Sequence, residues 1–250
     1  MHRFPTWHPT TGCIRPSPTG GCAQCYAFRG AKGKGGTPAF HPKELRTPSA
    51  IKTPTTWRVS DHGDLFAPGI KDAQIEQVWD QMTLCDGQGK RPKHVFLVCT
   101  RHPVRAYDLL FGQSAQHYGP GDFAPNIWLG TSVTEEADIK LAEFLVSRFS
   151  QWHLFLMLSP LISPVPLSRL LDRNAFGARS GFRFVYAAGE SGPHPRVCNP
   201  KAVDQARLDC EAAGVPFVFG GWGDAPSARQ RKAPEGIGQP MPDVFKISWE

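Results

Sequence analysis

Three cysteines stand close together near the start of the chain, in the stretch GCIRPSPTGGCAQCYAFRG at residues 12–30. Cys13, Cys22 and Cys25 have the spacing C-x8-C-x2-C, and the next cysteine along the chain is Cys85. The C-x2-C half is a compact chelating unit, because two thiolates at this separation can face one centre. The intervening loop is rich in proline and glycine, which lets the first thiol return to that centre. The spacing therefore predicts a metal site.

Two kinds of metal site suit three thiols. A 4Fe-4S cluster with only three protein thiolates keeps one iron open to an outside ligand. In radical S-adenosylmethionine enzymes this iron binds the cosubstrate, and an electron from the cluster gives a 5′-deoxyadenosyl radical. A structural zinc ion (Zn2+) instead takes four ligands, with His8 or His2 as the nearest histidine. Thiols without any metal are a third alternative.

The remaining cysteines have ordinary surroundings in the sequence. Cys99 ends an apolar run, Cys85 follows a helical pattern and Cys210 lies on one, and buried free cysteine behaves as a small hydrophobe. Seven cysteines is an odd number, and the chain shows neither a secretory signal nor an apolar run long enough to cross a membrane. We therefore expect a cytoplasmic protein without disulfides and without a membrane partner.

Elements that position these thiols follow from residue 55 onward, where short apolar runs alternate with helical patterns. The strands are expected at 56–60, 94–100, 126–133, 152–159, 182–190 and 216–223. The helices are expected at 71–84, 103–111, 134–148, 167–173 and 201–213, the last ending at Gly214. Several strands are apolar on both faces, which is typical of parallel strands between an interior and an outer layer of helices.

This alternation predicts an α/β fold, a partial or complete TIM-like (βα) barrel of parallel strands with the cysteine loop at its mouth. We expect one domain over residues 1–250. It comprises a cysteine-motif and basic loop region at 1–54, βα units at 55–223 and a C-terminal tail at 224–250.

Polar and small residues follow the predicted strands, where barrels collect their chemistry. Candidate ligands of S-adenosylmethionine are therefore Tyr26, Ser60, Asp61, Asp64, Ser132, Gly189, Glu190 and Ser191. Tyr26 adjoins Cys25 and can cover a cluster or an adenine ring, whereas Asp61 or Asp64 can bind ribose hydroxyls. The alternatives are ordinary packing for Tyr26, helix capping for the aspartates and loop anchoring for Glu190.

Substrate contacts are expected at two further strand ends and in a basic loop. Arg101 can bind a phosphate or carboxylate in two-pronged fashion, or pair with Asp64. Trp222 can stack on a base or plug the barrel. Lys32 and Lys34 belong to the basic stretch 29–52, whose alternative role is a solvated loop.

The charge balance favours an anionic partner. The formal net charge is +6 and the sequence pI is about 9.0, and basic side chains gain free energy by releasing counterions from phosphates. We find neither a phosphate-binding G-x4-G-K-[ST] loop nor a nucleophile elbow. Nucleic acid is accordingly the expected partner.

The motifs TWHPTTGC, GCAQCYA, SDHGDLF, TRHP, NIWLGTSV, GESG and GVPFVFGGWG occur in this order over residues 6–223. Together they resemble the phage- and prophage-associated three-cysteine-motif family, which is regarded as radical-SAM-like and has no assigned function. The resemblance implies a genomically adjacent partner protein and, for the cluster, an electron donor. The sequence departs from the family's pattern at His8, Ser159, Gly220 and Gly221, and in the longer loop between the first two cysteines.

The hypothesis from the sequence is a radical S-adenosylmethionine enzyme that modifies or repairs nucleic acid in a phage-related setting. Cys13, Cys22 and Cys25 hold its 4Fe-4S cluster. The alternative is a zinc-stabilised nucleic-acid-binding or adaptor protein without catalysis, and an electron carrier is a weaker third choice because carriers usually have complete ligation.

Overall fold

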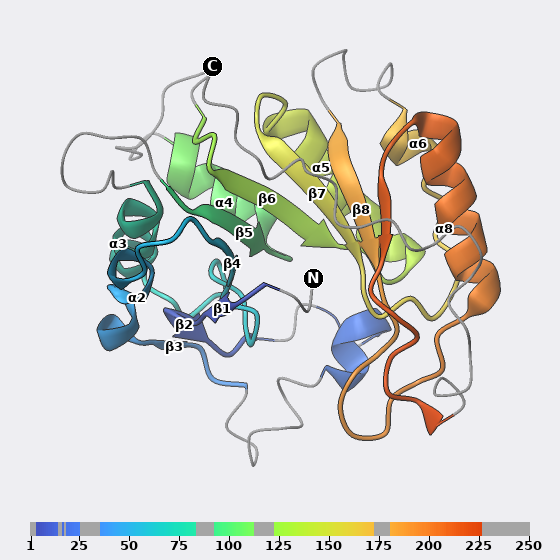
Figure 1. The fold of residues 1–250 in the computed structure, drawn as a ribbon, viewed down its shortest axis with the longest axis horizontal. Helices are drawn as coiled ribbons and strands as arrows, with labels where there is room; N and C mark the ends of the chain where they lie inside the picture. Colours follow the sequence, from blue (N-terminus) through green and yellow to red (C-terminus); the bar gives the residue numbers. More distant parts are fainter. Residues whose placement is uncertain are drawn as a thin grey trace.

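The core of the molecule is a parallel β-sheet with the strand order β1-β4-β5-β6-β7-β8-β9 (Figure 1). The structure is a computed structural model that describes residues 4–14, 17, 19–25, 36–83, 93–112, 123–172 and 181–226. The strands are β1 (Thr6–Trp7), β4 (Thr56–Val59), β5 (Val95–Cys99), β6 (Ile127–Ser132), β7 (His153–Leu158), β8 (Phe182–Ala187) and β9 (Phe217–Phe219). Each neighbouring pair is parallel.

Helices follow the strands and cover one face of the sheet. They are α3 (Asp72–Thr83), α4 (Pro103–Phe111), α5 (Ile139–Arg148), α6 (Ser168–Leu171) and α8 (Pro200–Ala213). The short helix α2 (Thr47–Ala50) and the 3₁₀ turns η1 (Gly20–Gln24) and η2 (Pro42–Glu44) precede β4, and the 3₁₀ turn η3 (Glu136–Asp138) precedes α5. Asn199 caps α8 at its start, and Gly214 ends it in the left-handed conformation at φ 64°.

The two faces of the sheet carry separate sets of apolar side chains. Residues such as Val98, Leu129 and Leu156 pack against the helices in the larger cluster. Alternate positions such as Leu97 and Phe155 form a second cluster on the opposite, concave face. This two-sided burial explains why the strands are apolar throughout.

The curled sheet is a half-barrel, so the prediction of a partial TIM-like barrel is confirmed. All six predicted strands and all five predicted helices exist, although several are shorter than expected and the helix expected at 134–148 begins with the turn η3. Among the described residues, no helix is long and apolar enough to cross a membrane.

An N-terminal ribbon was not predicted. Two-residue β1 pairs in parallel with β4, and β2 (Thr10–Thr11) pairs in antiparallel fashion with β3 (Ala39–Phe40). The indole Nε1 of Trp7 donates to the carbonyl of Glu44 at 2.7 Å, and Trp7 is fully buried. The ribbon therefore carries the segment before the first cysteine onto the edge of the half-barrel.

Candidate functional site

A cavity of about 450 Å³ lies at the carboxyl ends of the strands. Loops after β4, β5, β6, β7 and β8 all contribute to its wall, and so does the cysteine region. Its polar lining includes Ser60, Asp61, His62, Asp64, Thr100, Arg101, Ser132, Thr134, Ser159, Glu190 and Ser191. The volume falls in the range that holds small-molecule ligands and cofactors.

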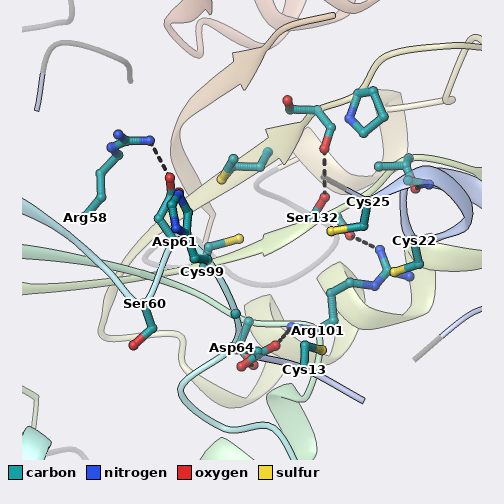
Figure 2. A pocket seen from close by; sticks show the side chains of 18 of the residues that line it. Cys13, Cys22, Cys25, Arg58, Ser60, Asp61, Asp64, Cys99, Arg101 and Ser132 are labelled. Atoms are coloured by element: carbon teal, nitrogen blue, oxygen red, sulfur yellow. Dashed lines mark hydrogen bonds and ion pairs between the residues drawn. The ribbon is translucent and has the colours of Figure 1, made fainter. Parts of the chain in front are cut away.

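The three cysteines of the motif all line this cavity. Figure 2 shows Cys22 and Cys25 entering from one side, with their sulfur atoms turned toward the space in the middle. Cys22 lies within the 3₁₀ turn η1, and the backbone N–H of Cys25 donates to its carbonyl at 3.4 Å. Residues three apart in a 3₁₀ turn lie on the same side, so this turn brings the two thiols together.

Burial makes two of the thiols weak acids. It raises the pKa of Cys13 to about 12, and the neighbouring charges of Asp64, Cys22 and Cys25 act in the same direction. Burial also raises the pKa of Cys22, an effect that Arg101 opposes. A metal bound here would have to displace the thiol protons, so its affinity would increase with pH.

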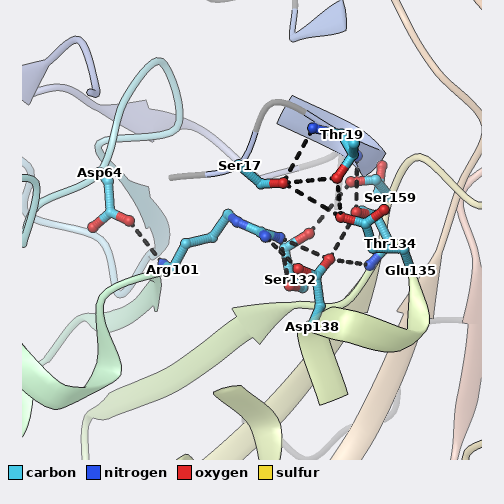
Figure 3. A network of polar contacts seen from close by, with 10 residues as sticks. Ser17, Thr19, Asp64, Arg101, Ser132, Thr134, Glu135, Asp138 and Ser159 are labelled. Atoms are coloured by element: carbon cyan, nitrogen blue, oxygen red, sulfur yellow. Dashed lines mark hydrogen bonds and ion pairs between the residues drawn. The ribbon is translucent and has the colours of Figure 1, made fainter. Parts of the chain in front are cut away.

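Three hydrogen bonds attach the η1 region to loops that follow β6 and β8. Thr19 donates through its hydroxyl to Glu135 at 2.7 Å, and the backbone N–H of Gly21 donates to the hydroxyl of Thr134 at 2.8 Å (Figure 3). Arg196 donates through Nη1 to the carbonyl of Gly20 at 2.9 Å. A side chain at Gly20 or Gly21 would meet Thr134 within 3 Å, so glycine is needed for this close approach.

Cys13 is positioned by backbone hydrogen bonds of its neighbour Gly12. Gly12 donates to the carbonyl of His62 at 3.0 Å and accepts from the backbone N–H of Asp64 at 3.4 Å. A Cβ on Gly63 would clash with the backbone of Gly12, so the two backbone segments approach this closely only because position 63 has no side chain. Backbone pairing to the segment after β4 thus sets the position of Cys13.

Arg101 has partners that the sequence did not indicate. Its guanidinium forms a two-pronged ion pair with Asp138, whose Oδ2 lies 3.0 Å from Nη1, and it donates to the carbonyl of Ser132. The expected alternative partner, Asp64, instead accepts from the backbone N–H of Arg101 at 2.8 Å. Asp138 also accepts both the backbone and hydroxyl protons of Thr134. Arg101 therefore braces the loop that supports the cysteines (Figure 3).

The three candidates that follow β4 differ in their surroundings. Asp64 is buried and accepts from Phe66, Thr100 and Arg101, so its carboxylate stabilises the loop rather than capping a helix. Burial raises the pKa of Asp64, an effect that His102 and these hydrogen bonds oppose. The hydroxyl of Ser60 is paired with that of Thr10 at 2.7 Å.

Asp61 pairs with Arg58 instead. Nη1 of Arg58 lies 2.7 Å from Oδ2 of Asp61, and the two side chains are 17% and 27% exposed, both lining the cavity. Asp61 thus presents its charge to the cavity together with a cation, whereas the carboxylate of Asp64 is enclosed by donors.

The candidates after β8 and β6 line the cavity, with partners of their own. The carboxylate of Glu190 accepts from the backbone N–H, Nε and Nη2 of Arg196 at 2.6–2.9 Å. This contact matches the loop-anchoring alternative for Glu190. Gly189 lies against the carbonyl of Trp222, where a side chain would clash. Ser132 donates to the carbonyl of Ser159 at 3.5 Å, and Ser191 also lines the wall.

The other expected contacts lie elsewhere. Trp222 is outside the lining of the cavity and packs edge-on against Phe219, with ring centroids 4.9 Å apart. His8 is also outside the lining, with its ring 4.5 Å from that of His62. Tyr26, Lys32, Lys34 and His2 lie outside the described residues.

Sequence reasoning missed two reactive groups on the cavity wall, Cys99 and Tyr186. Figure 2 shows Cys99 facing the pocket from the side opposite Cys22 and Cys25. Burial raises the pKa of Cys99 far above that of a free thiol, which keeps it protonated. Both residues sit in strands that are apolar on both faces, so no sequence pattern showed which face they occupy.

The donor set fits a thiophilic metal centre, since three thiols from one short segment line one cavity. The described residues contain no group of three metal-binding side chains close enough to hold an ion. Cys13 and the η1 region are held by separate sets of hydrogen bonds. Binding one metal centre with all three thiols would therefore require these thiols to move toward one another.

Comparisons with known proteins identify the family. Residues 2–241 match the family described as "Protein of unknown function (DUF5131)". The chain belongs to this family. Searches among curated proteins and among solved structures gave no match.

Proposed function

We propose that this member of the family is a radical S-adenosylmethionine enzyme that acts on nucleic acid. The observation that supports the proposal most is the shared cavity. Three thiols with an incomplete ligand set line the same pocket as the polar strand ends of a parallel half-barrel. Such strand ends are where barrels bind cofactors and substrates.

In this proposal Cys13, Cys22 and Cys25 hold a 4Fe-4S cluster at the mouth of the half-barrel. When bound, the cluster supplies the electron that cleaves S-adenosylmethionine to a 5′-deoxyadenosyl radical. The chain's own contribution is positioning. We call the loops that follow the carboxyl ends of the strands the rim of the cavity. Thr134 and Arg196 hold the η1 region against this rim, and Asp138, which is paired with Arg101, holds Thr134.

Polar groups of the rim contribute to cosubstrate binding. Ser132 and Ser191 line the cavity beside the cysteine region, and their hydroxyls can bond a ligand's amino or carboxylate groups. The carboxylate of Glu190 accepts three hydrogen bonds from Arg196, so it anchors this wall of the cavity rather than binding the ligand itself. Asp64 stabilises the loop that follows β4 and binds no ligand, because its oxygens already accept three hydrogen bonds from the protein.

The choice of nucleic acid rests on charge. The net charge is +6, and exposed Lys43 and Arg46 line a second pocket of about 460 Å³ together with one acid, Asp80. Phosphate contacts of this kind make affinity fall with salt. Binding to single- and double-stranded oligonucleotides is expected to weaken several-fold as the salt concentration rises from about 50 to about 200 mM, and salt-independent affinity would contradict this part of the proposal.

Metal analysis is the direct test. Protein purified without oxygen is expected to contain iron and sulfide in equal amounts and, once reduced, to form 5′-deoxyadenosine from S-adenosylmethionine. Cys22→Ala should lose the iron, whereas Cys210→Ala, a buried thiol on α8 outside the cavity, should retain it. Circular dichroism verifies that both variants fold. One zinc per chain with no sulfide would overturn the radical mechanism.

A further inference from the structure

Tyr186 carries a buried hydroxyl for which the described residues provide no partner. The residue lies in β8 on the concave face of the half-barrel and is 2% exposed. Its Oη has no hydrogen-bond partner within the part of the chain that the structure describes, and the side chain lines the cavity. Burying a hydroxyl without a partner costs free energy that a phenylalanine would avoid.

Gly220 makes room for this hydroxyl. A Cβ at position 220 would overlap Oη of Tyr186, so the glycine after β9 accommodates the tyrosine's polar tip. The buried hydroxyl thus weakens the fold, and Gly220 leaves space for it. Because Oη itself is enclosed, a ligand in the cavity supplies its partner when the tyrosine side chain turns toward that ligand.

Charged groups act on the same hydroxyl. Burial raises the pKa of Tyr186 to about 12, while the charge of Arg58 lowers it and that of Asp61 raises it. Arg58 and Asp61 form an ion pair and line the same cavity as Tyr186, so one ligand in the cavity can contact all three residues. At neutral pH the phenol remains protonated and can donate as well as accept.

The floor beside these groups is apolar and aromatic. Leu97, Phe155 and Met157 line the cavity together with the ring of Tyr186. An apolar lining that includes two aromatic rings beside a few polar groups suits a planar heterocycle, whose faces stack while its edge forms hydrogen bonds. Guanidinium, carboxylate and hydroxyl groups supply the donors and acceptors that proteins use to bind base edges.

We propose that Tyr186, Arg58 and Asp61 form a recognition site for the edge of a single nucleobase. This inference rests on the proposed function and names the part of the nucleic acid that enters the cavity. It assigns Asp61 to the substrate rather than to cosubstrate ribose. A base within a duplex has to leave the stack to reach this site.

Tyr186→Phe tests the site, because it removes the hydroxyl and keeps the ring. The probes are adenosine, guanosine, cytidine and thymidine, titrated calorimetrically into the full chain purified without oxygen. We expect at least one nucleoside to bind, and Tyr186→Phe to weaken it about three- to tenfold. Without nucleoside, the variant should melt about 2–4 °C higher, because a buried unsatisfied group is gone.

Tyr107→Phe is the matched control, since Tyr107 lies on α4 among aromatic rings and outside the cavity. Asp61→Asn should change which nucleoside binds best. Equal affinity in Tyr186→Phe and the parent, or no binding of any nucleoside at millimolar concentration, would overturn the inference. Cys22→Ala should retain nucleoside affinity, so loss of the cluster and loss of base recognition are distinguishable.

Discussion

The rim of the cavity and its floor differ in how far their polar groups find hydrogen-bond partners within the protein. At the rim, Asp64, Asp138, Glu190 and Arg196 have partners within the protein, and so do the terminal nitrogen atoms of Arg101, whose Nε alone in this group has none among the described residues. On the floor, Tyr186 has a buried hydroxyl without a partner among the described residues. A satisfied network stiffens a structure, whereas an unsatisfied group is free to bind something else. The rim therefore positions the thiols, and the floor is the region equipped for a ligand.

The largest expected effect breaks the rim. Asp138→Ala leaves the guanidinium of Arg101 without its carboxylate in a site where the two side chains are 13% and 5% exposed. Losing one partner of a buried ion pair costs about 3–5 kcal/mol, so the free energy of unfolding in urea should fall by this amount. Arg207→Ala in the exposed pair with Glu211 is the control, with a loss below about 1 kcal/mol. Equal losses in the two variants would show that the rim pair is not a special support.

A second change loosens the attachment of the cysteine region. Glu190→Gln weakens the hold on Arg196, which in turn bonds the carbonyl of Gly20. We expect a loss of about 1.5–3 kcal/mol in unfolding free energy and faster alkylation of Cys22, measured by mass spectrometry. Glu211→Gln should leave the alkylation rate unchanged. An unchanged rate in Glu190→Gln would mean that Arg196 does not control access to this thiol.

The rim also predicts a pH dependence of stability. Burial acts to raise the pKa of Asp138, but hydrogen bonds from Arg101 and Thr134 and the charge of Arg101 lower it below the ordinary 3.8 overall. A lowered pKa in the folded state means that the unfolded chain binds more protons. Stability from this group is present above about pH 4 and is lost as pH falls further. Its slope cannot exceed about 1.4 kcal/mol per pH unit.

Chemical unfolding between pH 2 and 6 measures this slope. Asp138→Asn should flatten the curve at the acid end relative to the parent chain. The same slope in both proteins would assign the acid sensitivity to other carboxylates.

The smallest effect lies far from both regions. Gly214 ends α8 at φ 64°, with open space where a Cβ would stand. Gly214→Ala should cost only about 1 kcal/mol, from the left-handed backbone alone. Thermal melting should detect the change, while nucleoside affinity stays equal to that of the parent. A larger loss would reveal a packing role that the structure does not show.

The strands and helices were predictable because each is a continuous pattern within a few residues. Runs such as 94–100 are apolar on both faces, and Gly214 marks the end of its helix. The same two-sided apolarity concealed the site. Nothing in the sequence showed that Cys99 and Tyr186 face the cavity while Val98 and Val185 pack on the outer face.

Long-range pairing was equally beyond the sequence. Two-residue β1 forms only because its neighbour β4 lies beside it, about fifty residues later in the chain. The sequence suggested Asp64 as an alternative partner of Arg101, yet the guanidinium of Arg101 binds Asp138. Which of several carboxylates meets a given arginine depends on how three loops pack, and local spacing carries no such information.

The cysteine segment has two separately fixed ends, and this has an evolutionary consequence. Gly12 is held by backbone pairing to the segment after β4, and Gly20 and Gly21 by Arg196 and Thr134. Cys13 adjoins the first anchor and Thr19 adds a hydrogen bond to Glu135 at the second, and a longer span between Cys13 and Thr19 adds little entropic cost. Relatives can therefore insert or delete residues there without displacing either anchor, which makes this span a natural place for the family to diversify.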